Sequence, residues 1–520
     1  MTNESTRAHL PLLLFLIVFV VNVEVVYGND SAQQGSMPKL EDDMEQATIS
    51  ITDLTIKDMV AMLMDKNITI RSKRLEKDLA AKNIQRAEGE FEPQLSFSLG
   101  MAHTEDQNDI EEEMIQNDTK IYKKDSTDLF LSVSKAFVTG TKLEAKVTGS
   151  KFITSTMRSL NSTESDNYKT FYSLELTQPL LRDAGTKFNR TRLRVASLSV
   201  ESSKLDALAT ESIVVTKAII NYYDLRLAQH KVILSREKIA KTQKLLGVVK
   251  KLQANGRLSR SDVWDVENSL SRFKAALTED LQAQREKSNQ LQILFAWDWD
   301  TSVELLRAVD ELPVMIASLP EFVDCFKTAL ENRADVKSKN IMVKQENEQV
   351  GFAKNQALPR VDLVGSYGYT GLDYDLWEAF ESGMGKYPSW NIGISVGVAL
   401  DGNKMKNADV TTAKIREQQA RLELRALKVA VAGDVDTILN ALMNADRRWQ
   451  HWRKVVEREK SRIDMGIDQL HAGRLSVRDV LFLEDRYIDA RFMVIEQRAA
   501  YAKTQALLAA AQGTVMEQFQ

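Results

Sequence analysis

The chain has 520 residues, a formal net charge of −4 at pH 7 and a pI of about 6.0. This near-balance of charge gives no reason to expect nucleic acid as a partner. Charged residues make up 27% of the chain and the mean hydropathy is −0.29, which favours a soluble helical surface over a membrane protein with many helical spans.

The N-terminus predicts a targeting segment. Leu10 to Val23 is almost entirely apolar, and Val26-Tyr27-Gly28 places small residues at the −3 and −1 positions of a cleavage site. We expect a signal peptide over residues 1–28, cleaved after about Gly28, and then a polar, acidic linker over residues 29–52. An uncleaved membrane anchor is the alternative, although the run is shorter than the ~20 residues that a span usually needs. Beyond it no stretch could span a bilayer as a helix, so any insertion must use strands.

The pattern after the linker occurs twice in the chain. A helical pattern from Leu54 to Phe91 resembles a second one from Phe322 to Leu358. The two match at one constant offset, which places Asn67 opposite Arg333. The chain therefore contains an internal duplication.

After each of these helices the apolar pattern changes to a period of two. The alternating stretches are Leu95 to Met101 and Tyr172 to Thr177 in the first half, and Val361 to Tyr369 and Trp390 to Leu400 in the second. One apolar face, one small or polar face and aromatic residues near the ends are what a transmembrane β-strand needs. The same pattern fits any half-buried soluble sheet, so the strands alone do not decide between the two.

The first half is longer than the second. Pro93 and Pro359 lie 266 positions apart, whereas Gly256 and Gly473 lie 217 positions apart. The difference leaves 49 additional residues between Pro93 and Gly256.

We assign this surplus to two features. His103 to Ser126 is polar and strongly acidic, and we interpret it as an exposed loop. Residues 128–148 alternate on either side of Thr139-Gly140, which predicts an additional β-hairpin that the second half lacks.

Long helices follow the strands in each half. There is no Pro from Leu180 to Leu312 or from Ser389 to the end, and about 70 residues lead up to Gly256. At ~1.5 Å per residue a continuous helix of that length would reach roughly 100 Å, which indicates coiled coil or a helical repeat. We therefore predict two repeats, residues 53–312 and 313–515, each with a helix, strands and a long helical hairpin.

The tip of each hairpin carries one short motif. Gly256-Arg257-Leu258-Ser259-Arg260-Ser261-Asp262-Val263 recurs as Gly473-Arg474-Leu475-Ser476-Val477-Arg478-Asp479-Val480. A glycine that can take φ > 0 ends one helix, and Ser-x-x-Asp then caps the next. The residues expected at the tips, where a partner would dock, are Gly256, Arg257, Leu258 and Ser259 with Gly473, Arg474, Leu475 and Ser476.

Asp262 and Asp479 allow two compatible interpretations. Each can complete a capping box and complement the helix dipole, which is worth roughly 0.3–1 kcal/mol. In a symmetric assembly they can also converge as acidic rings that line an aperture and favour cations, with nearby arginines as partners.

The chain carries no catalytic motif. It has no GxxxxGK[ST], GxSxG, HExxH or paired CxxC, and its five histidines are scattered without a second ligand at i+3 or i+4. Cys325 is the one cysteine and lies within a helical pattern, as a lone buried thiol would. We expect no enzyme activity, no cofactor and no metal site.

The order of helix, strands and long hairpin, doubled and preceded by a signal peptide, resembles the TolC-like outer-membrane efflux proteins. The resemblance extends from about Leu54 to Gly513. The residues that carry it are Ala-Leu-Pro-Arg-Val-Asp-Leu at 357–363, Leu-Thr-Gln-Pro-Leu-Leu at 176–181 and the two Gly-Arg-Leu-Ser-x-x-Asp-Val tips.

The resemblance implies a mainly α fold with β-structure. In it a homotrimer closes one β-barrel in outer-membrane lipid, and the helices continue as a coiled-coil barrel through the periplasm. The closed end opens when a periplasmic adaptor and an inner-membrane transporter of the RND or ABC type dock, in efflux or type I secretion. The family's aperture aspartate falls on Asp479, with Asp262 as its counterpart. Two features depart from the family: Phe482, where another acidic residue is frequent, and the hairpin at 128–148.

We therefore predict a passive export duct in the outer membrane with a periplasmic extension. The alternative is an extracytoplasmic coiled-coil scaffold or adaptor without a pore. That alternative would need the β segments to form a small soluble domain, and the Trp390–Leu400 strand argues against it. An enzyme has no supporting constellation.

Overall fold

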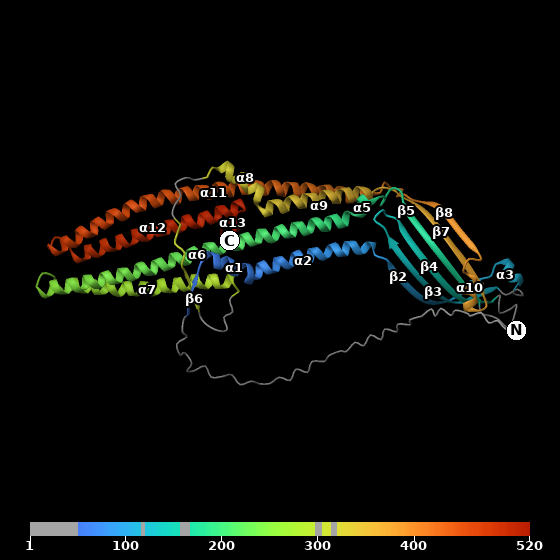
Figure 1. The fold of residues 1–520 in the computed structure, drawn as a ribbon, viewed down its shortest axis with the longest axis horizontal. Coiled ribbons are helices and arrows are strands. Elements are labelled where there is room, and N and C mark those ends of the chain that lie inside the picture. The colour runs from blue at the N-terminus through green and yellow to red at the C-terminus, as the bar shows by residue number, and fades with distance from the viewer. Residues whose placement is uncertain (1–49, 116–119, 156–166, 297–303, 314–319, 520) are drawn as a thin grey trace, which may run out of the picture. The chain divides into compact units, whose positions relative to one another are not determined.

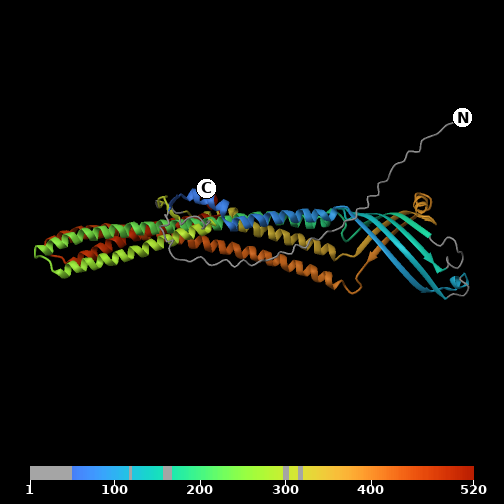
Figure 2. The ribbon, with the colours of Figure 1, turned by 90° about the horizontal axis from the view of Figure 1, so that it is seen from below.

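One order of elements occurs twice: a broken helix, β-strands, a long helix, a tight turn and a second long helix. The structure is a computed structural model and describes residues 50–115, 120–155, 167–296, 304–313 and 320–519. The predicted signal peptide and the linker up to residue 49 lie outside these residues. Figures 1 and 2 show the long helices side by side, with the sheet at one end of them.

The first helix of each repeat is broken once, where the sequence predicted a continuous helix. The broken helices are α1 (Ile56–Lys66) with α2 (Ile68–Glu88), and α8 (Phe322–Asn332) with α9 (Ala334–Gln356). At the first break Asn67 is extended, and its side chain accepts a 3.0 Å hydrogen bond from the N–H of Ile70. Its own N–H closes α1 on the carbonyl of Leu63, so one residue ends one helix and caps the next. Arg333 occupies the matching place in the second repeat.

Two antiparallel hairpins form the helical part. They are α6 (Thr191–Ala254) with α7 (Arg260–Leu294), and α11 (Lys404–His471) with α12 (Val477–Gln512). Helix α6 has 64 residues, which corresponds to roughly 96 Å at 1.5 Å per residue. The short helices are η1 (Gly89–Phe91), α3 (Ile110–Ile115), α5 (Thr186–Asn189), α10 (Leu376–Ser382) and α13 (Val515–Phe519).

The main core lies midway along the helices, around Tyr222 of α6. Its fully buried hydroxyl lies 2.8 Å from Asp310 Oδ2 and accepts hydrogen bonds from the N–H groups of Val309 and Asp310. Strand β1 (Ser50–Leu54) passes beside it and pairs in parallel with β6 (Glu304–Ala308). The end of the predicted linker, residues 50–52, was therefore assigned wrongly, because this pairing makes it a strand.

A six-stranded antiparallel sheet forms the other part. Its order is β2-β3-β4-β5-β7-β8, with four strands from the first repeat and two from the second. The strands are β2 (Gln94–Gln107), β3 (Ile121–Ala136), β4 (Lys142–Thr154), β5 (Asn167–Pro179), β7 (Arg360–Asp373) and β8 (Pro388–Gly397). Among the described strands β2 and β8 pair on one side only, so they are the two edges.

The prediction of a loop from His103 to Ser126 was wrong at both ends of this acidic stretch, which are strand. Strand β2 continues to Gln107 and β3 begins at Ile121, because charged residues of the two strands pair across the ladder. Lys123 Nζ lies 2.7 Å from Glu105 Oε1, and His103 Nδ1 lies 2.5 Å from Asp125 Oδ1. Opposite charges on facing strands stabilise the pairing although each residue alone disfavours a strand.

The register places apolar side chains from all six strands on one face of the sheet. Direct cross-strand partners on this face are Phe97, Leu131, Val147, Tyr172 and Tyr369. The adjacent row on the other face is mixed and consists of Ser98, Phe130, Thr148, Phe171 and Thr370. Every residue of β2 and of β8 is exposed. Among the described helices none is both long and apolar enough to cross a membrane.

Candidate functional site at the hairpin tips

Each hairpin turns at a glycine in the left-handed region. Gly256 has φ of 72° and Gly473 has φ of 70°. The N–H of Gly256 donates to the carbonyl of Gln253 at 2.9 Å, and the N–H of Arg257 donates to that of Leu252 at 2.9 Å. The second tip repeats this pair of bonds from Gly473 and Arg474. These bonds satisfy the last carbonyls of the ascending helix, as in a Schellman motif.

A capping box starts each descending helix. The N–H of Ser259 donates to Asp262 Oδ2 at 2.8 Å, and the N–H of Asp262 donates to Ser259 Oγ at 3.3 Å. In the second tip the N–H of Asp479 donates to Ser476 Oγ at 3.1 Å. Each carboxylate predicted to line the aperture therefore bonds within its own hairpin. There its negative charge stabilises the N-terminus of the descending helix.

The two tips pack against each other. The tip cluster consists of Leu245, Val249, Val263, Val266, Leu470, Val477, Val480 and Leu481, all buried. Leu258 and Leu475 of the tip motifs pack against this cluster, and Arg478 Nη2 lies 3.2 Å from Asp265 Oδ2 across the tips. Figure 1 shows both turns at the same end of the helices. The motifs therefore form one surface rather than two independent ones.

The outer surface of the tips carries arginine and aromatic side chains beside the aspartates. Arg257 and Arg474 are exposed, and the Arg260 guanidinium lies 5.4 Å from the centre of the Trp264 ring. Phe482, the predicted departure from the family, is 54% exposed, with the Arg486 guanidinium 4.8 Å from its ring centre. Such contacts are worth about 0.5–1 kcal/mol at exposed sites.

Glu484 of α12 lies close to the tips and was not singled out from the sequence. It is 7% exposed, and its Oε2 has no hydrogen-bond partner among the described residues. Loss of hydration on burial raises the pKa of the Glu484 carboxyl to about 7, although the positive charge of Lys241 acts to lower this pKa. The sequence feature that indicates its burial is its position one turn after Val480, on the face of α12 that packs against the other helices.

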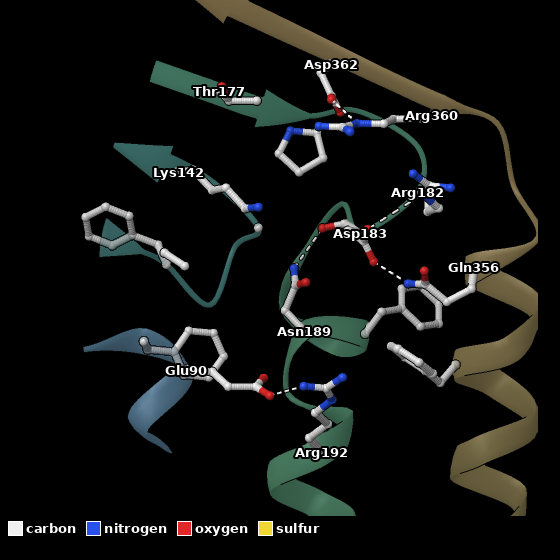
Figure 3. Close-up of a pocket in the computed structure, with 17 residues that line it drawn as sticks. Glu90, Lys142, Thr177, Arg182, Asp183, Asn189, Arg192, Gln356, Arg360 and Asp362 are labelled. Atoms are coloured by element: carbon white, nitrogen blue, oxygen red, sulfur yellow. Dashed lines mark hydrogen bonds and ion pairs between the residues drawn. The ribbon is translucent and has the colours of Figure 1, made fainter. Parts of the chain in front are cut away.

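A second candidate site lies where the sheet meets the helices. This junction pocket has a volume of about 440 Å³ (Figure 3). Lys142, Arg182 and Arg360 surround it, and Arg360 Nε donates to Asp362 Oδ2 at 2.5 Å. Asn189 Nδ2 donates to the carbonyl of Asp183 at 2.7 Å on its floor. Arg360 and Asn189 are thus bonded within the junction pocket, whereas the buried Arg182 Nε has no hydrogen-bond partner among the described residues.

Replacing Gly473 with valine is expected to lower the free energy of unfolding by about 1–2 kcal/mol, because a β-branched residue fits the left-handed region poorly. A Cβ at Gly473 meets no atom within 4 Å, so the loss reports backbone strain rather than a clash at Cβ. Gly433→Val inside α11 is the matched control, because its Cβ is equally unhindered and its φ is not positive. Thermal unfolding followed by circular dichroism measures both, and equal midpoints would contradict the expectation.

Comparison with known proteins agrees with this geometry. The family model described as outer membrane efflux protein matches residues 326–514. Nodulation protein T of Rhizobium leguminosarum bv. viciae is 22% identical over 311 residues, which cover 59% of this chain and 62% of that protein. The match thus spans less than two thirds of that relative's length.

Solved outer-membrane channels share the fold over most of its length. The channel OprN superposes with a TM-score of 0.65 at 14% identity, covering 88% of this chain and 90% of that chain. Campylobacter jejuni CmeC gives 0.63 at 15% identity, with 88% and 86% covered. The open state of Neisseria gonorrhoeae MtrE gives 0.62 at 14% identity, with 89% of each chain covered.

The protein therefore has the fold of the outer-membrane channels, as the family resemblance implied. Its second repeat matches the outer membrane efflux proteins, and the resemblance to the TolC-like family that the sequence carries is confirmed.

Proposed function

We propose that the protein is a passive exit duct of the outer membrane, serving efflux or secretion together with a periplasmic adaptor and an inner-membrane pump. The observation that carries this proposal is the sheet, which combines two open edges with an apolar face that α10 covers only around Thr170 and Tyr172. Lipid can cover the apolar face, and further copies of the chain can cover the edges.

The strand order supports ring closure by identical copies. In an antiparallel sheet of six strands the edge strands β2 and β8 run in opposite directions. Strand β8 of one copy can therefore pair antiparallel with β2 of the next, and no edge remains once the ring closes. We propose a homotrimer, as the family resemblance implies.

The helices support a long periplasmic extension. At roughly 96 Å, α6 is far longer than the ~30 Å hydrocarbon core of a membrane, and its surface is mostly polar or charged. The tip surface at its far end, with Arg257 and Arg474, is the proposed place of adaptor docking.

A coiled-coil scaffold without a pore is less well supported. In such a protein the exposed Phe97, Ile394 and Trp390 side chains would remain in water. A contiguous apolar surface of this kind marks contact with a membrane or a partner.

The direct test is purification in detergent followed by mass measurement and conductance in a planar lipid bilayer. We expect a trimeric mass and single-channel currents. A monomer that stays soluble without detergent and gives no currents would refute the duct.

Replacing both Asp262 and Asp479 with asparagine is expected to weaken block of these currents by multivalent cations. Asparagine keeps an oxygen that can accept the capping hydrogen bond but removes the charge of the proposed aperture. Ser259→Ala with Ser476→Ala is the matched control, because it removes the caps and keeps both carboxylates. If the serine variants relieve the block and the asparagine variants do not, the aspartates act only as caps.

A further inference from the structure

The hairpin of β3 and β4 lies inside the sheet, between β2 and β5. Phe97 of β2 faces Leu131 of β3, Leu131 faces Val147 of β4, and Val147 faces Tyr172 of β5. The hairpin therefore separates β2 from β5. Without it, these would be the two strands of the first repeat and would be neighbours in the sheet.

The hairpin also has the same two faces as the rest of the sheet. Its apolar face carries Leu129, Leu131, Val133, Leu143, Ala145 and Val147, in register with the apolar residues of β2 and β5. The opposite face carries Asp128, Glu144 and Lys146. A hairpin that stood beyond the membrane would not need to continue the apolar face at the same level.

The turn of the hairpin is fastened to the helical part at the junction pocket. The N–H of Gly185 donates to the carbonyl of Thr139 at 3.0 Å, and Thr141 Oγ1 donates to Gln178 Oε1 at 2.5 Å. A Cβ on Gly140 would lie 2.2 Å from the carbonyl oxygen of Asp183, so only glycine permits this approach. Figure 3 shows the residues on either side of this joint, with Lys142 from β4 and Asp183 from the segment before α6.

We propose that this hairpin widens the exit of the duct and thereby sets the size of the solutes that leave through it. The inference rests on the proposed trimer. Three copies of six strands make a ring of eighteen, whereas three copies without the hairpin would make twelve. With strands about 4.8 Å apart and tilted by about 40°, the backbone diameters are roughly 36 Å and 24 Å.

The wider ring leaves a water-filled lumen after side chains have occupied its inner surface, as rings of 16–18 strands do. Asp128, Glu144 and Lys146 would face that lumen. The substrate class implied is a bulky polar solute with a cross-section larger than a ring of twelve strands admits.

The first test deletes residues 108–167 and joins Gln107 to Tyr168 through Asn-Gly. This removes both strands and keeps the apolar residues of β2 and β5 on one face, with the two strands still antiparallel. Poly(ethylene glycol) of graded size is added on the sheet side of the reconstituted channel, and its partitioning is read from the conductance. We expect the largest polymer that enters to become smaller, with a cross-section lower by at least about twofold, because side chains take the same depth from both rings. An unchanged cut-off would overturn the proposal.

A second test keeps the sheet intact, in case the deleted chain does not fold. In a Cys325→Ser background, Thr148→Cys places a thiol on the polar face of β4 and Val147→Cys places one on the apolar face. A bulky, charged thiol reagent should lower the conductance of the first and leave that of the second unchanged. Equal responses would place the hairpin outside the lumen and overturn the proposal. Absence of currents from the parent channel would instead refute the proposed duct.

Discussion

Replacing Ile394 with lysine is expected to prevent assembly of the protein in the outer membrane. Ile394 lies on edge strand β8, is 66% exposed and faces Leu363 on the apolar side of the sheet. A lysine on the lipid face costs about 2–4 kcal/mol near the middle of the bilayer. Three copies in one ring would multiply this cost. Membrane fractionation and the yield of heat-modifiable trimer measure the effect.

The neighbouring Ser395 provides the matched control. It lies on the same strand, pairs with Asp362 and faces the opposite side of the sheet. A lysine there would lie in water, so we expect Ser395→Lys to assemble normally and to change only the ion selectivity. Equal loss of trimer in both variants would mean that the apolar face does not contact lipid.

Replacing Glu484 with glutamine is expected to stabilise the helical part above neutral pH. Burial raises the folded-state pKa of Glu484 to about 7, whereas the unfolded chain has the ordinary value of 4.5. The folded state therefore holds the proton more tightly, so stability is highest below pH 4.5 and falls as the pH rises to about 7. Glutamine abolishes this dependence, and the gain at pH 8 is up to about 3 kcal/mol.

Glu267 is the control for this substitution, because it holds the matching position of the first repeat. Its carboxylate is 41% exposed and lies 2.8 Å from Lys250 Nζ. We expect Glu267→Gln to lack the gain in stability at pH 8, because this side chain is exposed and paired. If the Glu484→Gln variant shows the same pH dependence of thermal unfolding as the parent protein between pH 5 and 8, the Glu484 carboxylate is hydrated in the assembled protein.

The features that the sequence predicted well depend on neighbouring residues. The tip turn needs only a glycine with φ > 0 followed by Ser-x-x-Asp, and the structure forms both parts at Gly256 and Gly473. The alternation in β7 and β8 likewise follows from one exposed apolar face. Each of these patterns lies within about eight consecutive residues, so it does not depend on how distant parts of the chain fold.

The features that the sequence could not provide depend on distant partners. β1 and β6 have only five residues each and pair across about 250 positions. Glu105 and Lys123 belong to strands because they face each other, which neither stretch indicates alone. The unpaired burial of Glu484 depends in the same way on the helices that pack around it. The residue pattern of one segment does not show which residues of a distant segment will pack against it.

The antiparallel order of the sheet restricts how such a duct can evolve. Each chain enters the sheet from the helices at β2 and returns to them after β5, so the number of strands between must be even. A single added strand would leave the next long helix on the outer side of the membrane. The sheet can therefore widen only by whole hairpins, and in the proposed trimer each added hairpin would enlarge the ring by six strands.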